Sequence, residues 1–247
     1  MLYVLGDIHG CFDEFQKMLE VINFDYGGDR MFFVGDYIDK GKDSYKMLRY
    51  IEEHFEDDCF YFLRGNHEDE FISYIDLLDS IDSEKSELEL CEILHDRFND
   101  FDRYGTIRQI LSDEEMCKYA PLTSWADIFR KFPARTIFQY NKKRISLAHA
   151  GYLPGMHSQE EKEDFALYAR EDSITKGGRP HSITIAGHTP TCIEGQFAFN
   201  HGNVFKYYDE EKDCTFYDID CGSCLRKKYK DAKLACIRLD DYEIFYV

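Results

Sequence analysis

The chain has 247 residues, of which 44% are hydrophobic, and it carries a formal net charge of -18. This length and apolar content suit one domain with a full hydrophobic core, so we expect residues 1–247 to form a single domain. The acidic balance argues against nucleic acid as a partner, because phosphate backbones are held by clustered Lys and Arg.

No run of the sequence approaches the roughly 18 apolar residues of a membrane span, and Met1 leads directly into a predicted strand. We therefore expect a cytoplasmic protein with no membrane partner. Nine cysteines are scattered over a long chain without a signal peptide, which favours reduced thiols. Cys221 and Cys224 have the spacing of a metal or redox pair, but no second pair matches them, so we interpret them as ordinary loop cysteines.

The N-terminal part of the chain alternates strands with helices. Apolar runs predict strands at Leu2–Leu5, Met31–Val34 and Cys59–Leu63. Between them, apolar residues recur at helical spacing over Cys11–Ile22 and Asp43–His54. This alternation is typical of a parallel sheet with helical crossovers.

Each of these strands ends in a glycine-bounded polar loop. The loops are Gly6-Asp-Ile-His-Gly10, Gly35-Asp-Tyr-Ile-Asp-Lys-Gly41 and Arg64-Gly-Asn-His-Glu68. Asp7, Asp36 and Asn66 recur about thirty residues apart, which is roughly the length of one strand-helix-strand unit. We therefore expect all three at the carboxyl edge of neighbouring parallel strands, where open α/β sheets bind ligands.

After Glu68 the pattern changes. Apolar residues at helical spacing between Phe71 and Phe98 predict two or more helices, and residues 69–120 hold 15 acidic against 5 basic side chains. This excess of -10 predicts a solvated helical cap over one side of the sheet edge, as an insertion of about residues 69–133. A charged helix face with no substrate role is the alternative.

The C-terminal part is richer in strands. Ser124 is the expected N-cap of a helix that ends near Phe132, and Glu160–Arg170 is also expected to be helical. The other predicted strands are Arg135–Tyr140, Arg144–Ala148, Ser182–Ala186, Val204–Tyr208, Cys214–Ile219, Leu234–Leu239 and Glu243–Val247, the first two joined by a hairpin. Strands of this number favour a mixed sheet or two packed sheets.

Two of these strands end in the motifs His149-Ala-Gly151 and Gly187-His-Thr189. The candidate metal ligands at the strand ends are Asp7, His9, Asp36, Asn66, His149 and His188. Oxygen and imidazole ligands without thiolate suit manganese, iron or zinc better than calcium. Paired metals lower the pKa of a bound water and clamp the oxygens of a phosphoryl group, so we expect a two-metal hydrolase with Asp36 between the metals.

The five motifs, which lie between residues 6 and 189, resemble those of the phosphoprotein-phosphatase family of calcineurin-like metallophosphoesterases, bacterial type. The resemblance implies a metal-dependent phosphatase with an α/β fold, a four-layer αββα sandwich of two mixed sheets with a helical cap insertion. It also implies two divalent ions, Mn²⁺ with Fe or Zn as alternatives, and a bridging hydroxide that attacks phosphorus in line. One ion would be held by Asp7, His9 and Asp36, and the other by Asp36, Asn66, His149 and His188.

The resemblance further implies that His67, oriented by Asp39, protonates the leaving oxygen as general acid. Lys40 stands where relatives usually carry arginine, and we expect it to bind phosphate. Arg170, in a stretch similar to the family's Leu-Trp-x-Arg, is a second candidate. Arg64 is a third candidate, although it could equally brace its loop by pairing with a carboxylate.

Within the family, Glu68 and Arg64 resemble the protein phosphatases more than the dinucleotide hydrolases, which implies a serine/threonine protein phosphatase or broad phosphomonoesterase that acts on a phosphorylated protein or a small phosphoester. The alternative is a hydrolase of diadenosine tetraphosphate. A non-catalytic module that docks a basic partner through its acidic cap is disfavoured, because every ligand position and His67 are present. The sequence leaves the oligomeric state open.

Overall fold

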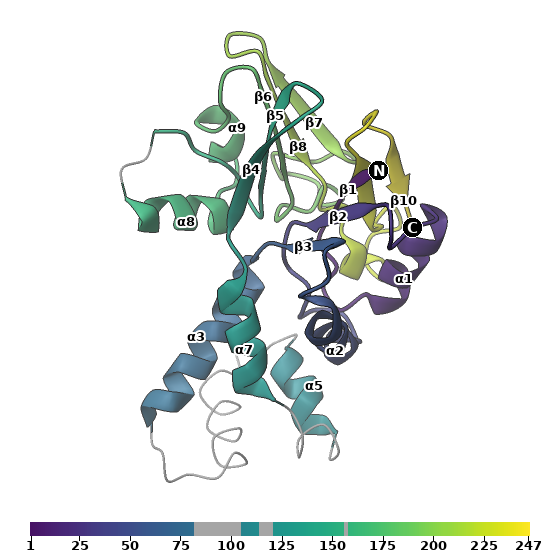
Figure 1. Ribbon diagram of the computed structural model, residues 1–247, viewed down its shortest axis with the longest axis vertical. Coiled ribbons are helices and arrows are strands. Elements are labelled where there is room, and N and C mark those ends of the chain that lie inside the picture. Colours follow the sequence, from purple (N-terminus) through teal and green to yellow (C-terminus); the bar gives the residue numbers. More distant parts are fainter. Residues whose placement is uncertain (82–104, 114–120, 156–157) are drawn as a thin grey trace.

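The computed structural model describes residues 1–81, 105–113, 121–155 and 158–247, which form two mixed sheets of five strands each (Figure 1). The first sheet has the order β10-β9-β1-β2-β3, with bounds β1 Leu2–Leu5, β2 Arg30–Phe33, β3 Phe60–Phe62, β9 Ala235–Arg238 and β10 Ile244–Tyr246. The second has the order β4-β5-β6-β8-β7, with bounds β4 Arg135–Tyr140, β5 Lys143–Ala148, β6 Ser182–Ala186, β7 Phe205–Asp209 and β8 Cys214–Asp218. The predicted mixed α/β class is confirmed.

Strands β1, β2 and β3 are parallel neighbours in the first sheet. Helix α1 (Phe12–Val21) joins β1 to β2, and helix α2 (Ser44–His54) joins β2 to β3. Apolar residues recur at helical spacing in both helices, so each helix buries one face. In α1 the buried residues are Phe15, Met18 and Leu19. The predicted alternation is confirmed, and the carboxyl ends of three strands meet at one edge of the sheet.

The strands of the first sheet send alternate side chains into two hydrophobic cores. In β1, Tyr3 and Leu5 join the core beneath α1 and α2, whereas Val4 joins a second core with Ile145 and Ile185 of the other sheet. The two sheets therefore pack face to face.

Helix α8 (Gln159–Tyr168) packs against the outer face of the second sheet at β5, and the short helix α9 (Asp172–Thr175) follows it. Ala166 and Leu167 of α8 pack against Ala148 of β5. A capping box at Ser158 starts α8, since its hydroxyl accepts a hydrogen bond from the backbone N–H of Glu161. This helix completes the expected four layers.

A tight turn joins β4 to β5, as the sequence predicts. The strands pair antiparallel up to Tyr140 opposite Lys143. The two residues between them, Asn141 and Lys142, have φ angles of 47° and 65°. Two consecutive left-handed residues match the twist of a two-residue hairpin.

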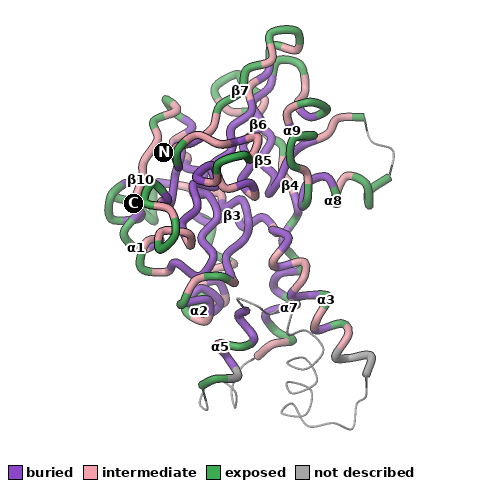
Figure 2. The backbone as a smooth tube through the Cα atoms, turned by 180° about the vertical axis from the view of Figure 1, so that it is seen from behind, coloured by how far each residue is buried: buried purple, intermediate pink, exposed green. Residues whose placement is uncertain are grey.

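The insertion between β3 and β4 extends away from both sheets (Figures 1 and 2). Its described helices are α3 (Asn66–Ile81), α5 (Thr106–Ser112) and α7 (Leu122–Lys131). Phe71 of α3 contacts Phe129 of α7, with ring centroids 5.6 Å apart, and Trp125 is buried. These side chains extend the core of the first sheet into the insertion. The part of the predicted helical stretch beyond residue 81, up to Phe98, lies outside the described residues.

Helix α7 begins earlier than expected. Its N-cap is Pro121, so Ser124 lies inside the helix rather than capping it, and no side chain caps this end. The burial of Trp125 and Phe129, rather than a hydrogen-bonded cap, holds this end of the helix in place.

Among the described residues, no helix combines the length and the apolar character that crossing a membrane requires. The described cysteines are all free thiols. Cys221 is buried beside the short 3₁₀ helix η1 (Ser223–Leu225), which contains the half-buried Cys224. The two form no disulfide.

Candidate metal centre

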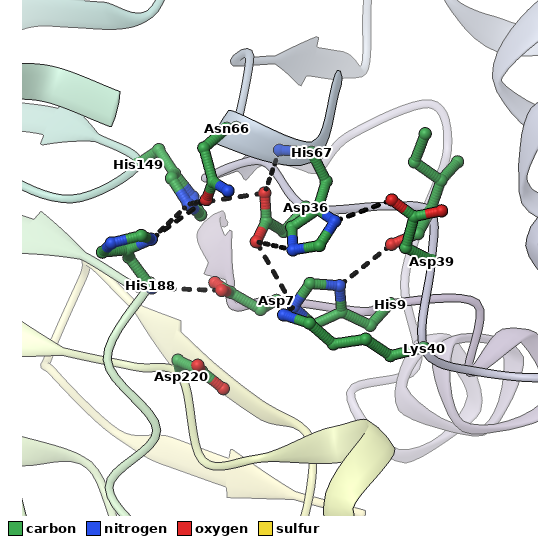
Figure 3. A network of polar contacts seen from close by, with 12 residues as sticks. Asp7, His9, Asp36, Asp39, Lys40, Asn66, His67, His149, His188 and Asp220 are labelled. Carbon is green, nitrogen blue, oxygen red and sulfur yellow. Dashed lines mark hydrogen bonds and ion pairs between the residues drawn. The ribbon is translucent and has the colours of Figure 1, made fainter. Parts of the chain in front are cut away.

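Five strand-end loops bring their polar side chains together at one edge of the two sheets (Figure 3). His9, Asp36 and His188 have φ angles of 47°, 54° and 74°, in the left-handed region that non-glycine residues rarely adopt. Such a backbone is costly, and it persists where the surrounding structure holds it, as it often does at functional sites. At this edge of the sheets, the left-handed backbone turns the side chains of His9, Asp36 and His188 toward one centre.

The glycines of the motifs leave room for these side chains. A Cβ on Gly65 would collide with the carboxylate of Asp36, and a Cβ on Gly187 would collide with that of Asp7. Each glycine therefore permits a close approach between its own loop and a carboxylate from another strand.

Two buried histidines, His9 and His149, have an unprotonated ring nitrogen that faces the centre. Nδ1–H of His9 donates to the carbonyl of Ile38 at 2.9 Å, and Nδ1–H of His149 donates to that of Val34 at 3.0 Å. Burial lowers the pKa of both imidazoles, which favours the neutral ring. A neutral ring with a protonated Nδ1 has a lone pair on Nε2, the form that ligates metals.

Three ligand atoms crowd one side of the centre. Nε2 of His149 lies 3.0 Å from Oδ1 of Asn66 and 3.1 Å from Nδ1 of His188, and the last two atoms are 3.0 Å apart. Burial lowers the pKa of His188 to about 2. Neutral imidazoles and an amide oxygen that converge in this way fit a cation between them.

Asp36 lies between the two sides. Its Oδ1 is 3.4 Å from Nε2 of His149, and its Oδ2 is 3.3 Å from Nε2 of His9. Burial alone would raise the pKa of this carboxyl, but His149, His67 and His9 outweigh it and hold the pKa low. Ligand atoms within 4.8 Å of one another form two groups that share this carboxylate: His9, Asp36 and His67, and Asp36, His149 and His188.

Asp7 lies beside both groups (Figure 3). Its Oδ2 accepts a hydrogen bond from the backbone N–H of His188 at 3.1 Å. Its Oδ1 is buried and has no hydrogen-bond partner among the described residues. Burial, Asp220 and Asp36 raise the pKa of Asp7. A buried oxygen without a donor fits a cation ligand, and a bound cation would also favour the ionised form.

His67 and Asp39 form a hydrogen-bonded pair at the rim of the centre. Nδ1–H of His67 donates to Oδ2 of Asp39 at 2.7 Å, and Nε2 lies 3.8 Å from Oδ2 of Asp36. Burial opposes the charged ring, but Asp36 and Asp39 outweigh it and raise the pKa of His67. The ring is therefore oriented and has its second nitrogen toward the centre.

Glu68 has a structural position that the sequence interpretation missed. Its fully buried carboxylate accepts hydrogen bonds from the backbone N–H groups of Asp36 at 2.8 Å, Tyr37 at 2.9 Å and Gly65 at 3.0 Å. Burial raises its pKa to about 8. Glu68 thus ties together the backbones of two loops that carry candidate ligands.

The three candidate phosphate-binding cations lie in different surroundings. Lys40 donates from Nζ to Nε2 of His9 at 2.8 Å, and Arg170 donates to Oγ1 of Thr189 at 3.4 Å. Both line a cavity of about 270 Å³ beside the centre. Arg64 instead pairs with Asp69 at 3.2 Å and with Glu163 at 3.5 Å.

Asp218 and Asp220, at the end of β8, are buried acids near the centre that the sequence interpretation also missed. Asp220 lines the same cavity, accepts a hydrogen bond from the backbone N–H of Gly222 at 2.9 Å, and has a pKa raised to about 6 by burial. The same signal, an acid just after a strand, marks Asp7 and Asp36 in the sequence.

Known proteins share this sequence pattern. A sequence model of the calcineurin-like phosphoesterase family matches residues 1–194. A symmetrical bis(5'-nucleosyl)-tetraphosphatase of Wigglesworthia glossinidia brevipalpis is 36% identical over 152 residues, 62% of this chain and 45% of that protein. A protein of the same name from Actinobacillus succinogenes is 48% identical over 50 residues, 20% of this chain and 18% of that protein. The chain thus spans less than half the length of these relatives.

Solved structures share the fold. A protein assigned as a diadenosine tetraphosphatase has a TM-score of 0.59 at 18% identity, over 100% of this chain and 92% of that one. A protein serine/threonine phosphatase from Saccharomyces cerevisiae has a TM-score of 0.51 at 15% identity, over 100% of this chain and 78% of that one. With 194 of its residues matched and the four-layer fold in place, the chain belongs to the calcineurin-like phosphoesterase family, as its five motifs predict.

Proposed function

We propose that the protein is a metal-dependent phosphoester hydrolase and that its substrate is a symmetrical dinucleoside tetraphosphate. The observation that carries the proposal is the pair of ligand groups that share Asp36. Asp7 and His9 would complete one site with Asp36, and Asn66, His149 and His188 would complete the other. When bound, two divalent ions supply Lewis-acid stabilisation of the charge on a reacting phosphoryl group.

The protein's own groups would position and protonate the substrate. His67, whose Nδ1–H is held by Asp39 at 2.7 Å, would donate the proton on Nε2 to the leaving oxygen. Lys40 and Arg170 lie in the adjoining cavity, where their positive charges would hold phosphate oxygens.

The lining of this cavity favours a nucleotide over a phosphorylated protein. Beyond the two cations it presents the apolar side chains of Ile193 and Leu225 and the amide of Gln196, a combination that suits a base next to its phosphates. Neither of the two residues that favoured a protein phosphatase lines this cavity, since Glu68 accepts hydrogen bonds from backbone N–H groups and Arg64 is paired with acids. The tetraphosphatase names of the matched relatives support the same choice.

The test compares diadenosine tetraphosphate with a phosphoserine peptide on Mn²⁺-loaded protein. We expect kcat/KM for the dinucleotide to exceed that for the peptide by at least about tenfold, equal to about 1.4 kcal/mol of transition-state binding. A preference for the peptide would overturn the substrate assignment, and turnover of neither would overturn the proposed activity.

A cavity-filling variant sharpens this test. Ile193→Trp should raise KM for the dinucleotide by roughly tenfold, because the indole would occupy the apolar part of the cavity that would hold the base. Turnover of p-nitrophenyl phosphate, which has no base, should stay within about twofold. An equal loss for both substrates would mean that the cavity does not hold the base.

A further inference from the structure

Helix α5 of the insertion is hydrogen-bonded to the loop that carries Asp39. Nε2–H of Gln109 donates to the carbonyl of Gly41 at 2.6 Å, and the backbone N–H of Ser44 donates to Oε1 of Gln109 at 3.2 Å. These contacts hold a short helix of the insertion against the loop and the start of α2. They do not touch the side chain of Asp39.

Thr106, at the start of α5, makes the contacts that do reach this side chain. Its backbone N–H and its hydroxyl both donate to Oδ1 of Asp39, each at 2.8 Å. The same hydroxyl oxygen accepts from the backbone N–H of Asp39 at 3.1 Å. One residue of the insertion therefore contacts both the carboxylate and the backbone of Asp39.

The backbone of this loop needs such support. Asp39 and Lys40 have φ angles of 67° and 65°, two consecutive non-glycine residues in the left-handed region. That conformation is unfavourable unless neighbouring groups hold it. Thr106 is only 1% exposed, so water does not readily replace its hydroxyl.

The two oxygens of Asp39 have separate partners. Oδ1 accepts both hydrogen bonds from Thr106, which leaves Oδ2 for Nδ1–H of His67 at 2.7 Å. A carboxylate whose first oxygen is held in this way has its rotation restricted, and its second oxygen stays aimed at the imidazole. Without the hydroxyl, Oδ1 of Asp39 would keep only the backbone N–H of Thr106, and the backbone N–H of Asp39 would keep only the hydroxyl of Ser44, at 3.0 Å.

We propose that Thr106 is a positioning residue for the reaction, which acts through Asp39 to orient His67 as proton donor. This inference rests on the proposed function, because it assigns His67 the role of general acid. It makes the acidic insertion a part of the catalytic apparatus, in addition to any contact it makes with a substrate.

The first test is a spectroscopic one that does not depend on turnover. In Zn²⁺-loaded protein, the His67 Nδ1–H proton should give a downfield proton NMR resonance, identified by its absence in His67→Asn. Thr106→Ser should retain this resonance, whereas Thr106→Val and Thr106→Ala should lose or broaden it through exchange with solvent. An unchanged resonance in either variant that folds would overturn the proposal.

The second test uses leaving groups. With phenyl phosphate, whose leaving phenol has a pKa of about 10, Thr106→Val should lower kcat by about tenfold at unchanged KM and metal content. With p-nitrophenyl phosphate, a better leaving group, the loss should be within about twofold. Equal losses for both substrates would contradict a role through the proton donor.

Gln109→Leu is the matched control, because it removes contacts between α5 and the loop but leaves Thr106 in place. This variant should keep the His67 resonance, and any change in its kcat relative to the wild type should be the same for phenyl phosphate and for p-nitrophenyl phosphate. If it reproduces the effects of Thr106→Val, the insertion acts through general docking and the role of Thr106 is wrong. Failure of the wild type to hydrolyse any phosphoester would instead overturn the proposed function, whatever the NMR result.

Discussion

The strand-end loops and the helical insertion supply the candidate site in different ways. In the loops, the candidate ligands Asp7, Asp36 and His188 each directly follow a glycine, and short motifs reveal them in the sequence. In the insertion, Thr106 has no surrounding motif and reaches Asp39 across 67 positions of the chain. The positions of the candidate ligands are thus set by local backbone geometry, whereas Asp39, the partner of the proposed proton donor His67, is held by a tertiary contact.

The largest effect should come from the loops. Asp36→Asn removes the carboxylate that both ligand groups share. Since changes next to metal ligands already cost about 10- to 100-fold in affinity, loss of a shared ligand should cost more than about 100-fold for each ion and abolish turnover. Metal analysis of dialysed protein measures this. Unchanged occupancy by two ions would show that Asp36 is not the bridge.

The next effect separates proton donation from metal binding. His67→Asn should reduce kcat for a poor leaving group by roughly 10²- to 10⁴-fold and leave metal content intact. Steady-state kinetics on phenyl phosphate, with metal analysis of the same sample, checks this. A matching loss of bound metal would assign His67 to the metal ligands instead, alongside His9 and Asp36.

A third change tests how the loops are held. Glu68→Gln replaces a buried oxygen that accepts from backbone N–H groups with an amide NH₂ that cannot accept. Each buried donor left unpaired costs about 1–3 kcal/mol, so the free energy of unfolding should fall by at least that amount. Urea denaturation measures the loss, and the exposed Glu53→Gln is the control, expected to change stability by less than about 0.5 kcal/mol. If both variants lost the same stability, Glu68 would not hold the two loops together.

The smallest effect is a shift in pH dependence. Asp39 raises the pKa of His67, and a general acid must be protonated, so turnover should fall as the pH rises through this raised pKa. Asp39→Asn removes a carboxylate that raises the pKa of His67, so turnover of the variant should fall at a lower pH than turnover of the wild type. A pH profile of kcat on phenyl phosphate checks the direction, and a shift to higher pH would contradict the assignment.

The sequence predicts the fold well wherever the signal is local. The apolar run of β1 and the helical spacing of Phe15 and Leu19 are visible without a structure, and so is the turn at Asn141 and Lys142. The start of α7 could not be predicted, because the burial of Trp125 outweighs the capping preference of Ser124. At this position, side-chain packing decides where the helix begins, and the local capping preference does not.

Within the candidate site, the motifs predict which side chains gather at the sheet edge. They do not predict what Glu68 contacts: in the sequence this residue only helps to choose between related enzymes, whereas in the structure helix α3 turns its carboxylate toward the backbone of the Asp36 loop. Thr106 could not be found for a similar reason, since nothing in its neighbours records a contact with Asp39. Contacts between distant side chains require the folded chain.

The most direct test of the account is a titration of Mn²⁺ into metal-free wild-type protein, with bound ions and hydrolysis of diadenosine tetraphosphate measured in the same samples. We predict two ions bound per chain and hydrolysis that appears only as the sites fill. Full hydrolysis in the metal-free protein, or saturation of both sites without any hydrolysis, would contradict the account.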